Sequence, residues 1–456
     1  MAPKKRQKSM AEHSVFPINQ FPREILAEIF WHCLPDMNPE ARKMPAQMFK
    51  KAAPLLVSSI CSSWRELALA TPELWVTVGI IIRNPDMDPS ATAHVVNTWL
   101  ERSGTLPLKL YLGQLSLLYD VPLSKTNPAL AKSILSVFYS HSSRWQDVTL
   151  SLYETRSLSL PRLDTPLLRS FRLSGPWQEA FHFPFRKSSL LTELSWPSSI
   201  DASKNTQIPW SQISCLHILD GMSPFSVSEM IQLCPRLEEF WVGCSGFDEV
   251  ANLPREPKVE NGLLRKLELY GYDDIIPLLH SLTLPALEQF TCSSQSGVED
   301  VPVIPTDLHE SLLDLLTRSK CKLKKLKLGD CNFSADGFLE CLEHEAFETI
   351  QDLSIVEWPQ LTDDVLIRLT HPPPPAAPRI LLPKLTHLSL DYCLDASPGT
   401  LGEMVSSRYY TETNEVEELE VLVLTVQDLD EEDETIIEDL AADGLDTHIS
   451  IMSRPD

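Results

Sequence analysis

The fold of this chain is decided by a short pattern, clearest in the stretch Leu323-Lys324-Lys325-Leu326-Lys327-Leu328. Leucines stand at its first, fourth and sixth positions, and lysines fill the other three. Successive side chains of a β-strand point to opposite faces, so Leu326 and Leu328 would share one face and the lysines the other. The stretch therefore predicts a strand that is buried on one face and meets water on the other.

The same spacing of apolar residues recurs eleven times, with first positions separated by roughly 22 to 36 residues. One instance is weak, because a leucine-rich chain produces it by chance, but eleven in succession indicate an internal repeat. The instances begin at Trp145, Leu168, Leu191, Ile213, Leu237, Leu264, Leu287, Leu323, Ile350, Leu385 and Leu419. Apolar residues at helical spacing between them predict helices over 226–233, 275–282, 308–317, 335–343 and 363–369.

This repeat resembles the leucine-rich repeat. The stretches from Leu323 to Cys331 and from Leu385 to Cys393 also carry the small polar residue with which that family ends the motif. The resemblance implies an α/β fold, an irregular horseshoe-shaped solenoid over 76–426, with strands inside and helices outside. It also implies that Cys331 and Cys393 occupy turns and satisfy buried backbone groups, so they are not metal ligands or nucleophiles.

Upstream of the repeats, a strand is predicted over 74–80, a helix capped by Ser90, and a second strand over 108–112.

Between the apolar positions of the repeats stand charged and polar residues that would line the strand surface. They form a mixed charged surface suited to binding: Glu193, His217, Glu238, Glu239, Lys266, Glu268, Lys324, Lys325 and Lys327.

A different pattern lies near the N-terminus, between Ile18 and Trp75. Pro22 suits the first turn of a helix, and apolar residues then recur at helical spacing through Phe30. A second helical segment carries apolar residues from Leu56 to Ala68. Two helices of about a dozen residues cannot bury this much apolar surface between themselves, so the pattern predicts that a further partner covers it.

The segment resembles the divergent F-box abundant in mushroom-forming fungi. The matching features are Phe21-Pro22-x-Glu24-Ile25-Leu26-x-x-Ile29-Phe30, Val57-x-x-x-Cys61-x-x-Trp64-Arg65-x-Leu67-Ala68 and Thr71-Pro72-Glu73-Leu74-Trp75. The chain departs from the family at Phe21, where leucine is usual, and in a long insert over about 35–54. The alternative is that these helices are only an N-terminal cap on the domain that follows.

The resemblance implies an F-box-like domain over 17–75 that docks on a Skp-type adaptor and, through it, on a cullin of an SCF-type ubiquitin ligase. The adaptor-facing residues would be Phe21, Pro22, Ile25, Leu26, Ile29, Val57, Ile60, Cys61, Trp64 and Leu67. Among them, Pro22, Ile29 and Trp64 are expected to be the main anchors.

Composition narrows the class of protein further. The chain has 456 residues and a net charge of −24, which disfavours nucleic acid as a partner because phosphate would be repelled. No apolar run reaches the roughly 18 residues of a membrane span, so we expect an intracellular protein without a membrane partner. The ten cysteines are scattered, and Cys341 with His344 supplies two potential ligands without a closing pair, so we expect no metal and no cofactor.

Three segments read as flanking or loop regions. Residues 1–16 are expected to be a disordered basic tail in which Lys4, Lys5, Arg6 and Lys8 are either a nuclear address or a plain solvated terminus, so the location would be cytoplasmic, nuclear or both. Residues 372–378 form a proline-rich loop, either stiff or a ligand for an aromatic groove. Residues 427–456 are expected to be an acidic tail, either solvated or attracting a basic target.

No phosphate-binding, hydrolase, kinase or metalloprotease motif occurs, so we expect a non-catalytic binding subunit. The function that the sequence favours is recognition of an unknown protein target for ubiquitin transfer. Two alternatives remain: an F-box scaffold acting outside ubiquitination, which detection of a cullin would separate, and an enzyme with an unrecognised site on the strand surface.

Overall fold

The computed structural model describes residues 18, 21–34, 53–82, 87–114, 127–152, 160–175, 183–244, 259–271, 275–293, 308–329, 334–357, 361–371, 379–411 and 415–451. The predicted basic tail, residues 35–52 of the predicted insert, the proline-rich loop and Cys331 lie outside these ranges. The chain divides into two compact units, Met1–Leu150 and Ser151–Asp456. The sequence placed a boundary after residue 75, whereas the first unit continues well past it.

In the described part of the first unit, three short helices and a turn of 3-10 helix come first. They are α1 (Arg23–His32), α2 (Leu55–Ile60), α3 (Ser62–Leu69) and η2 (Pro72–Trp75). Trp75 is fully buried, its indole N–H donates to the carbonyl of Ala68 over 2.8 Å, and its ring meets that of Trp99 edge-on at 4.9 Å. Trp99 belongs to the next helix, so this contact ties the N-terminal helices to the strands and helices that follow them.

The rest of the first unit alternates strands and helices. Its elements are β1 (Thr77–Ile82), α4 (Pro89–Arg102), β2 (Leu108–Gln114), α5 (Pro128–Ser140), η5 (Ser142–Arg144) and β3 (Trp145–Ser151). β1 and β2 are parallel, with Thr77 opposite Lys109. The predicted strand over 74–80 starts later because Pro72–Trp75 form the 3-10 turn. The predicted cap Ser90 is wrong: the carboxylate of Asp88 caps α4 by accepting the N–H of Ala91 over 2.6 Å.

The second unit is built on a large parallel sheet. In spatial order its strands are β5 (Ser170–Ser174), β7 (Glu193–Trp196), β8 (Cys215–Met222), β9 (Glu239–Cys244), β11 (Lys266–Gly271), β13 (Gln289–Ser293), β14 (Lys325–Gly329), β15 (Asp352–Val356), β17 (His387–Asp391), β19 (Val421–Val426) and β20 (Asp446–Ile451). Every pair of neighbours within this order is parallel. Each of the eleven repeat motifs therefore contributes a strand, β3 included, which confirms that expectation.

Neighbouring strands are linked by the same pair of backbone hydrogen bonds at the point where each strand begins. The carbonyl of Glu238 accepts N–H groups from both Arg265 and Lys266, and the carbonyl of Arg265 accepts those of Glu288 and Gln289. The same double acceptance recurs farther along the sheet, for example at Lys324. Because each strand start is fixed by the strand before it, the buried leucines fall in register from one repeat to the next.

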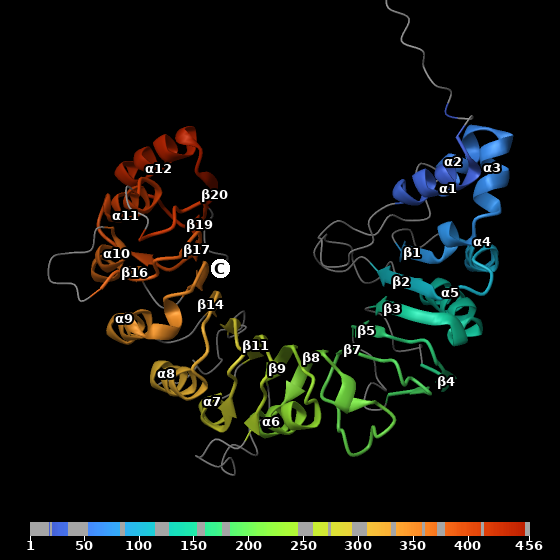
Figure 1. Ribbon diagram of the computed structural model, residues 1–456, viewed down its shortest axis with the longest axis horizontal. Helices are drawn as coiled ribbons and strands as arrows, with labels where there is room; N and C mark the ends of the chain where they lie inside the picture. Colours follow the sequence, from blue (N-terminus) through green and yellow to red (C-terminus); the bar gives the residue numbers. More distant parts are fainter. Residues whose placement is uncertain are drawn as a thin grey trace, which may run out of the picture. The chain divides into compact units, whose positions relative to one another are not determined.

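The helices of the second unit lie along one side of these strands (Figure 1). They are α6 (Pro224–Leu233), α7 (Ile276–Ser281), α8 (Leu308–Ser319), α9 (Ala335–Glu343), α10 (Asp363–Leu369), α11 (Thr400–Tyr409) and α12 (Glu431–Asp443). The first five match the helices predicted between the repeats. Smaller elements are the strand pairs β4 (Leu163–Asp164) with β6 (Phe185–Arg186), β10 (Val259–Glu260) with β12 (Leu282–Thr283) and β16 (Leu361–Thr362) with β18 (Leu394–Asp395), and the 3-10 turns η6 (Trp210–Gln212) and η8 (Glu345–Phe347).

The predicted acidic tail requires a correction, because most of it is folded. Four acidic residues occupy the first turn of α12, where the positive end of the helix dipole favours carboxylates. Ile437 and Leu440 are buried on its inner face, and α12 packs against α11. The negative charge of this segment therefore lies on a packed helix, and β20 follows it as the last strand of the sheet.

Candidate functional site

The residues predicted to face an adaptor lie on α1, on α2 and α3, or next to these helices, at different depths. Phe21, Pro22, Ile25 and Ile60 are exposed. Partly buried are Ile29, Cys61, Trp64 and Leu67. Leu26 and Val57 are each only 5 % exposed, so their side chains belong to the core of the first unit.

Local sequence explains how α1 presents these side chains. Pro22 has no backbone N–H that would need a hydrogen-bond partner at the start of the helix. Its carbonyl accepts the N–H groups of Ile25 and Leu26, each over 3.1 Å. Leu26 and Phe30, four residues apart, point into the core. Ile25 and Ile29 are also four residues apart and lie beside that buried row, so together they form the outer apolar row of the helix.

The second and third helices are separated by one extended residue. Cys61 has φ −154° and ψ 172°, which ends α2 and allows α3 to start in a new direction. The Arg65 side chain spans this break, because its Nε donates to the carbonyl of Ser58 over 3.0 Å. Trp64 packs on Phe30 of α1, with ring centroids 4.9 Å apart. Trp64 therefore joins α3 to α1 and keeps only part of its ring accessible.

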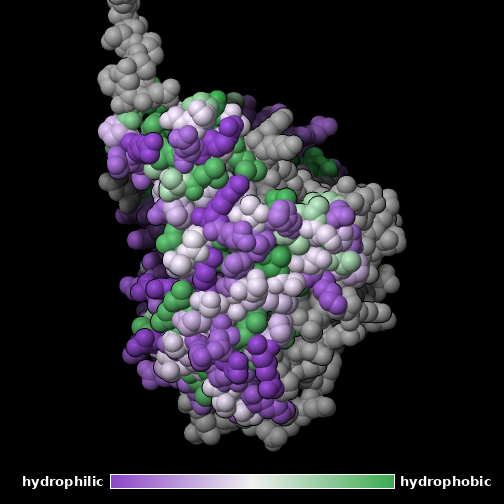
Figure 2. Space-filling view, turned by 90° about the vertical axis from the view of Figure 1, so that its right-hand side faces the viewer, coloured by the Kyte–Doolittle hydropathy of each residue, from purple (hydrophilic) through white to green (hydrophobic). Residues whose placement is uncertain are grey.

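Several large apolar side chains of these helices are exposed. Ile60 is 58 % exposed and Ile25 47 % exposed, and large apolar side chains are also accessible at Ile18, Phe21, Trp31, Leu56 and Leu69. Figure 2 shows hydrophobic residues in green, interspersed with hydrophilic ones in purple, near the top, where α1 to α3 lie in Figure 1. Exposed apolar side chains that gather into one patch are typical of an interaction surface.

The sequence analysis did not include Trp31 and Leu56 among the candidate residues, although both are well exposed. A helical wheel through α1 would have placed Trp31 off the buried Leu26–Phe30 row, and tryptophan is enriched at protein interfaces. Its ring meets that of His32 edge-on, with centroids 5.1 Å apart. Both residues add to the exposed apolar side chains of these helices.

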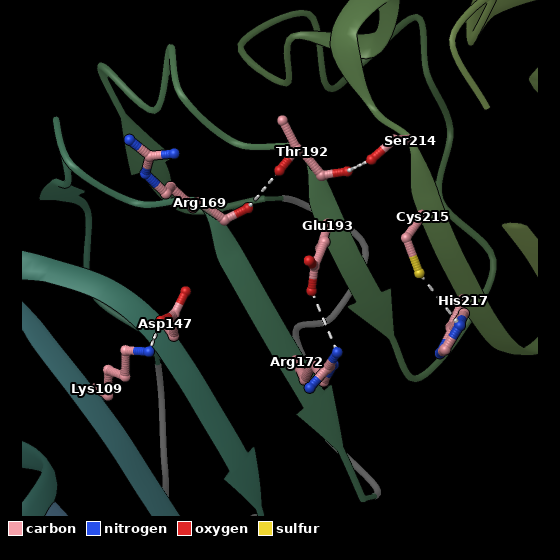
Figure 3. Close-up of polar contacts among 9 residues, drawn as sticks. All are labelled: Lys109, Asp147, Arg169, Arg172, Thr192, Glu193, Ser214, Cys215 and His217. Atoms are coloured by element: carbon pink, nitrogen blue, oxygen red, sulfur yellow. Dashed lines mark hydrogen bonds and ion pairs between the residues drawn. The ribbon is translucent and has the colours of Figure 1, made fainter. Parts of the chain in front are cut away.

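A second candidate surface is the water-facing side of the parallel strands in the second unit. The positions predicted to lie there are partly or fully exposed, as expected: Glu193, His217, Glu238, Glu239, Lys266, Glu268, Lys324, Lys325 and Lys327. Several pair across or along strands, including Arg172 with Glu193 at 3.2 Å (Figure 3), Lys266 with Glu268 at 2.7 Å and Lys325 with Asp352 at 2.8 Å. In the first unit, Lys109 of β2 pairs with Asp147 of β3 at 3.5 Å.

The strand surface also holds aromatic rings. Trp241 and Tyr270 stand on β9 and β11 with ring centroids 4.9 Å apart. The Tyr270 hydroxyl donates to Glu268 over 2.7 Å, and burial together with this carboxylate raises the pKa of Tyr270. Large aromatic rings surrounded by charges of both signs suit the binding of a protein chain.

The cysteines predicted to be structural can be checked at one position. Cys393 is buried, and its thiol lies 3.7 Å from the carbonyl of Ile355, as expected for a turn residue that satisfies a buried backbone group. Burial raises the pKa of Cys393 to about 12 and that of Cys341 to about 12, so neither is a thiolate at neutral pH. His344 uses its ring nitrogens on Thr317 and on the N–H of Ala346.

In the described ranges, no helix is long and apolar enough to cross a membrane. The chain matches no protein-family model, and no curated protein matches it either.

Proposed function

We propose that this protein is the substrate-recognition subunit of an SCF-type ubiquitin ligase. The helices α1 to α3 would dock on a Skp-type adaptor, and the second unit, as an irregular leucine-rich-repeat solenoid, would bind a target protein. The observation that carries the proposal is the number of exposed apolar side chains on α1 to α3, Ile25 and Ile60 among them, which a partner would cover. The F-box resemblance of the same residues supplies the identity of that partner.

The role requires binding and positioning alone. The cullin, reached through the adaptor, would bring a charged ubiquitin-conjugating enzyme close to a lysine of the bound target. Holding both on one assembly raises their effective concentration, so an intermolecular transfer becomes nearly intramolecular. The mixed charges and the Trp241–Tyr270 pair on the strand surface support this use of the second unit.

The alternative is a scaffold that uses the same helices to bind the adaptor but never engages a cullin. The exposed apolar surface favours both functions equally. Detection of a cullin in the purified complex would separate them, as would a protein that accumulates when this chain is deleted.

The test is co-purification of the full-length chain with the adaptor and the cullin. The most informative variant is Ile25→Glu with Ile60→Glu, because both side chains are exposed and their replacement should leave the first unit folded. Loss of two apolar contacts, each replaced by a charge, should weaken adaptor binding by at least about 30-fold. Ile367→Glu is the matched control, since Ile367 is 46 % exposed on α10 of the second unit.

The proposal fails if the double variant retains the adaptor as well as the parent chain does, with circular dichroism showing that both are folded. Capture of the adaptor without a cullin would instead favour the scaffold. Ile29→Ala with Trp64→Ala is also expected to abolish adaptor binding while the second unit stays folded. It is a less specific test, because Trp64 also holds α3 against Phe30.

A further inference from the structure

Three potential metal ligands converge on the strand surface of the second unit. Cys215 and His217 are two residues apart on β8, so their side chains leave the same face of the sheet. The register of β8 with β9 places Glu239 opposite Cys215. The Cys215 sulfur lies 3.5 Å from Nε2 of His217, and the three ligand atoms are all within 4.8 Å of one another. In the part of the chain that the structure describes, no other three such side chains meet this closely.

The spacing fits a tetrahedral zinc ion. Bonds of about 2.3 Å to sulfur and about 2.0 Å to nitrogen, at a tetrahedral angle, place these two atoms about 3.5 Å apart. The Cys215 sulfur and His217 nitrogen already stand at that distance, before any metal binds. A thiolate, an imidazole and a carboxylate are all zinc donors, and three protein ligands leave the fourth position for water or another donor.

The charges around the cluster also favour a cation. Two carboxylates on the neighbouring strands are neutralised by cationic side chains, Glu193 by Arg172 and Glu268 by Lys266. Glu239, by contrast, makes no ion pair with any described residue. In Figure 3, Glu193 points toward Arg172 and away from Cys215, so we do not count it as a fourth ligand.

We propose that Cys215, His217 and Glu239 bind a Zn²⁺ ion through the sulfur, Nε2 and a carboxylate oxygen. Cys215 and His217 are half-buried and Glu239 is exposed, so water can reach these ligands. The rings of His217 and Trp241 lie beside each other with centroids 6.4 Å apart, which limits the movement of the imidazole. Binding would require loss of the thiol proton, so it should release protons to the solvent.

The test uses the full-length chain, stripped with a chelator and titrated with Co²⁺. Tetrahedral coordination by a thiolate gives a sulfur-to-cobalt charge-transfer band and strong visible bands, and Zn²⁺ should then abolish both by displacing the cobalt. Cys215→Ser, His217→Gln and Glu239→Gln should each lower the affinity for Co²⁺ by at least about 100-fold. Circular dichroism establishes that each variant is folded.

Two variants serve as matched controls. Cys33→Ser removes an exposed cysteine from the first unit, and His387→Gln removes an exposed histidine that stands opposite Asp352 on neighbouring strands. Both should titrate like the parent chain. The proposal is overturned if the parent shows no charge-transfer band, or if the band survives in Cys215→Ser. Either result would mean that Cys215 and His217 form a thiol–imidazole hydrogen bond without metal. The measurement involves no adaptor, so it is independent of whether the N-terminal helices bind one.

Discussion

The guanidinium of Arg408 donates from its Nε to the carbonyl oxygen of Leu369 over 2.6 Å, across 39 residues of sequence. Its other nitrogens donate to the carbonyls of Leu381 and Leu382 over 2.6 and 2.8 Å. Leu369 ends α10, and the two later leucines precede β17, so one side chain of α11 holds both sides of the segment that contains the proline-rich loop. Burial lowers the pKa of Arg408 to about 10, which still leaves it charged at neutral pH.

Arg408→Met should destabilise the second unit by about 3 to 5 kcal/mol, because three buried carbonyl groups would lose a charged donor. The measurement is the denaturant midpoint, followed by intrinsic fluorescence. Arg236→Met, at an exposed position of the same unit, is the control and should change little. Equal midpoints for Arg408→Met and the parent would show that the carbonyls find other partners.

Gly271 occupies a position that no other residue can take without distortion. Its φ is +140°, and an added Cβ would stand 1.9 Å from the carbonyl oxygen of Cys244. Gly271→Ala should therefore destabilise the unit by about 2 to 4 kcal/mol, measured by thermal or denaturant unfolding.

The chain offers a close control for this substitution. Gly262 has no atom within 4 Å of an added Cβ, so Gly262→Ala should leave stability unchanged or raise it by up to about 1 kcal/mol. If both alanine variants unfold alike, the backbone at Gly271 is more adaptable than its conformation indicates.

Substitution of Asp433 tests whether the acidic C-terminal segment is packed against the rest of the second unit. Its carboxylate is buried and accepts the N–H of Gly402, at the start of α11, over 2.7 Å. Asp433→Ala should cost about 1.5 to 3 kcal/mol, because a hydrogen bond to a charged group is lost in the interior. Glu438→Gln, on the exposed face of the same helix, is expected to have little effect. A solvated tail would instead make the two substitutions indistinguishable in a denaturation experiment.

The lowered pKa values of two histidines make the stability of the fold depend on pH. Burial is the main cause that lowers the pKa of His141, assisted by the positive charge of Arg144 and opposed by Glu101. Burial also lowers the pKa of His344. Below the ordinary histidine pKa of about 6.5, the unfolded chain therefore binds more protons than the folded one, so stability falls as the pH drops from about 6.5 toward the folded pKa values.

His141→Gln should make the free energy of unfolding depend less steeply on pH over that interval. Denaturant unfolding at several pH values between about 7.5 and 5 measures the slope. His94→Gln replaces an exposed histidine of α4 and serves as the control. A slope that is unchanged in His141→Gln contradicts the prediction.

The repeat was readable from sequence because each strand buries its leucines by local alternation. Leu267 and Leu269, for example, are both buried on β11, and the helices between repeats follow from the same periodicity. The helix and strand at the C-terminal end were not predicted. The many acidic residues of α12 are typical of a solvated tail, and its buried apolar row is short. Helix α5 was not predicted either, although its apolar residues recur at helical spacing just before the first repeat.

The candidate sites show where a sequence stops being informative. Residue types at helical spacing identified the N-terminal helices, but spacing alone did not separate the buried Leu26 and Val57 from the exposed Ile25 and Ile60. The Cys215–His217–Glu239 cluster was not found because Glu239 lies 24 residues beyond Cys215 and only the strand register brings them together. His217 was predicted merely to lie on a mixed charged surface.

Within the second unit, strands that are neighbours in space are also neighbours along the repeat series. A gene duplication or deletion that adds or removes one whole repeat would therefore disturb only two junctions and leave the remaining pairs intact. Evolution could lengthen the strand surface or exchange part of it without rebuilding the rest. A protein of this construction can change the residues on its strand surface one repeat at a time.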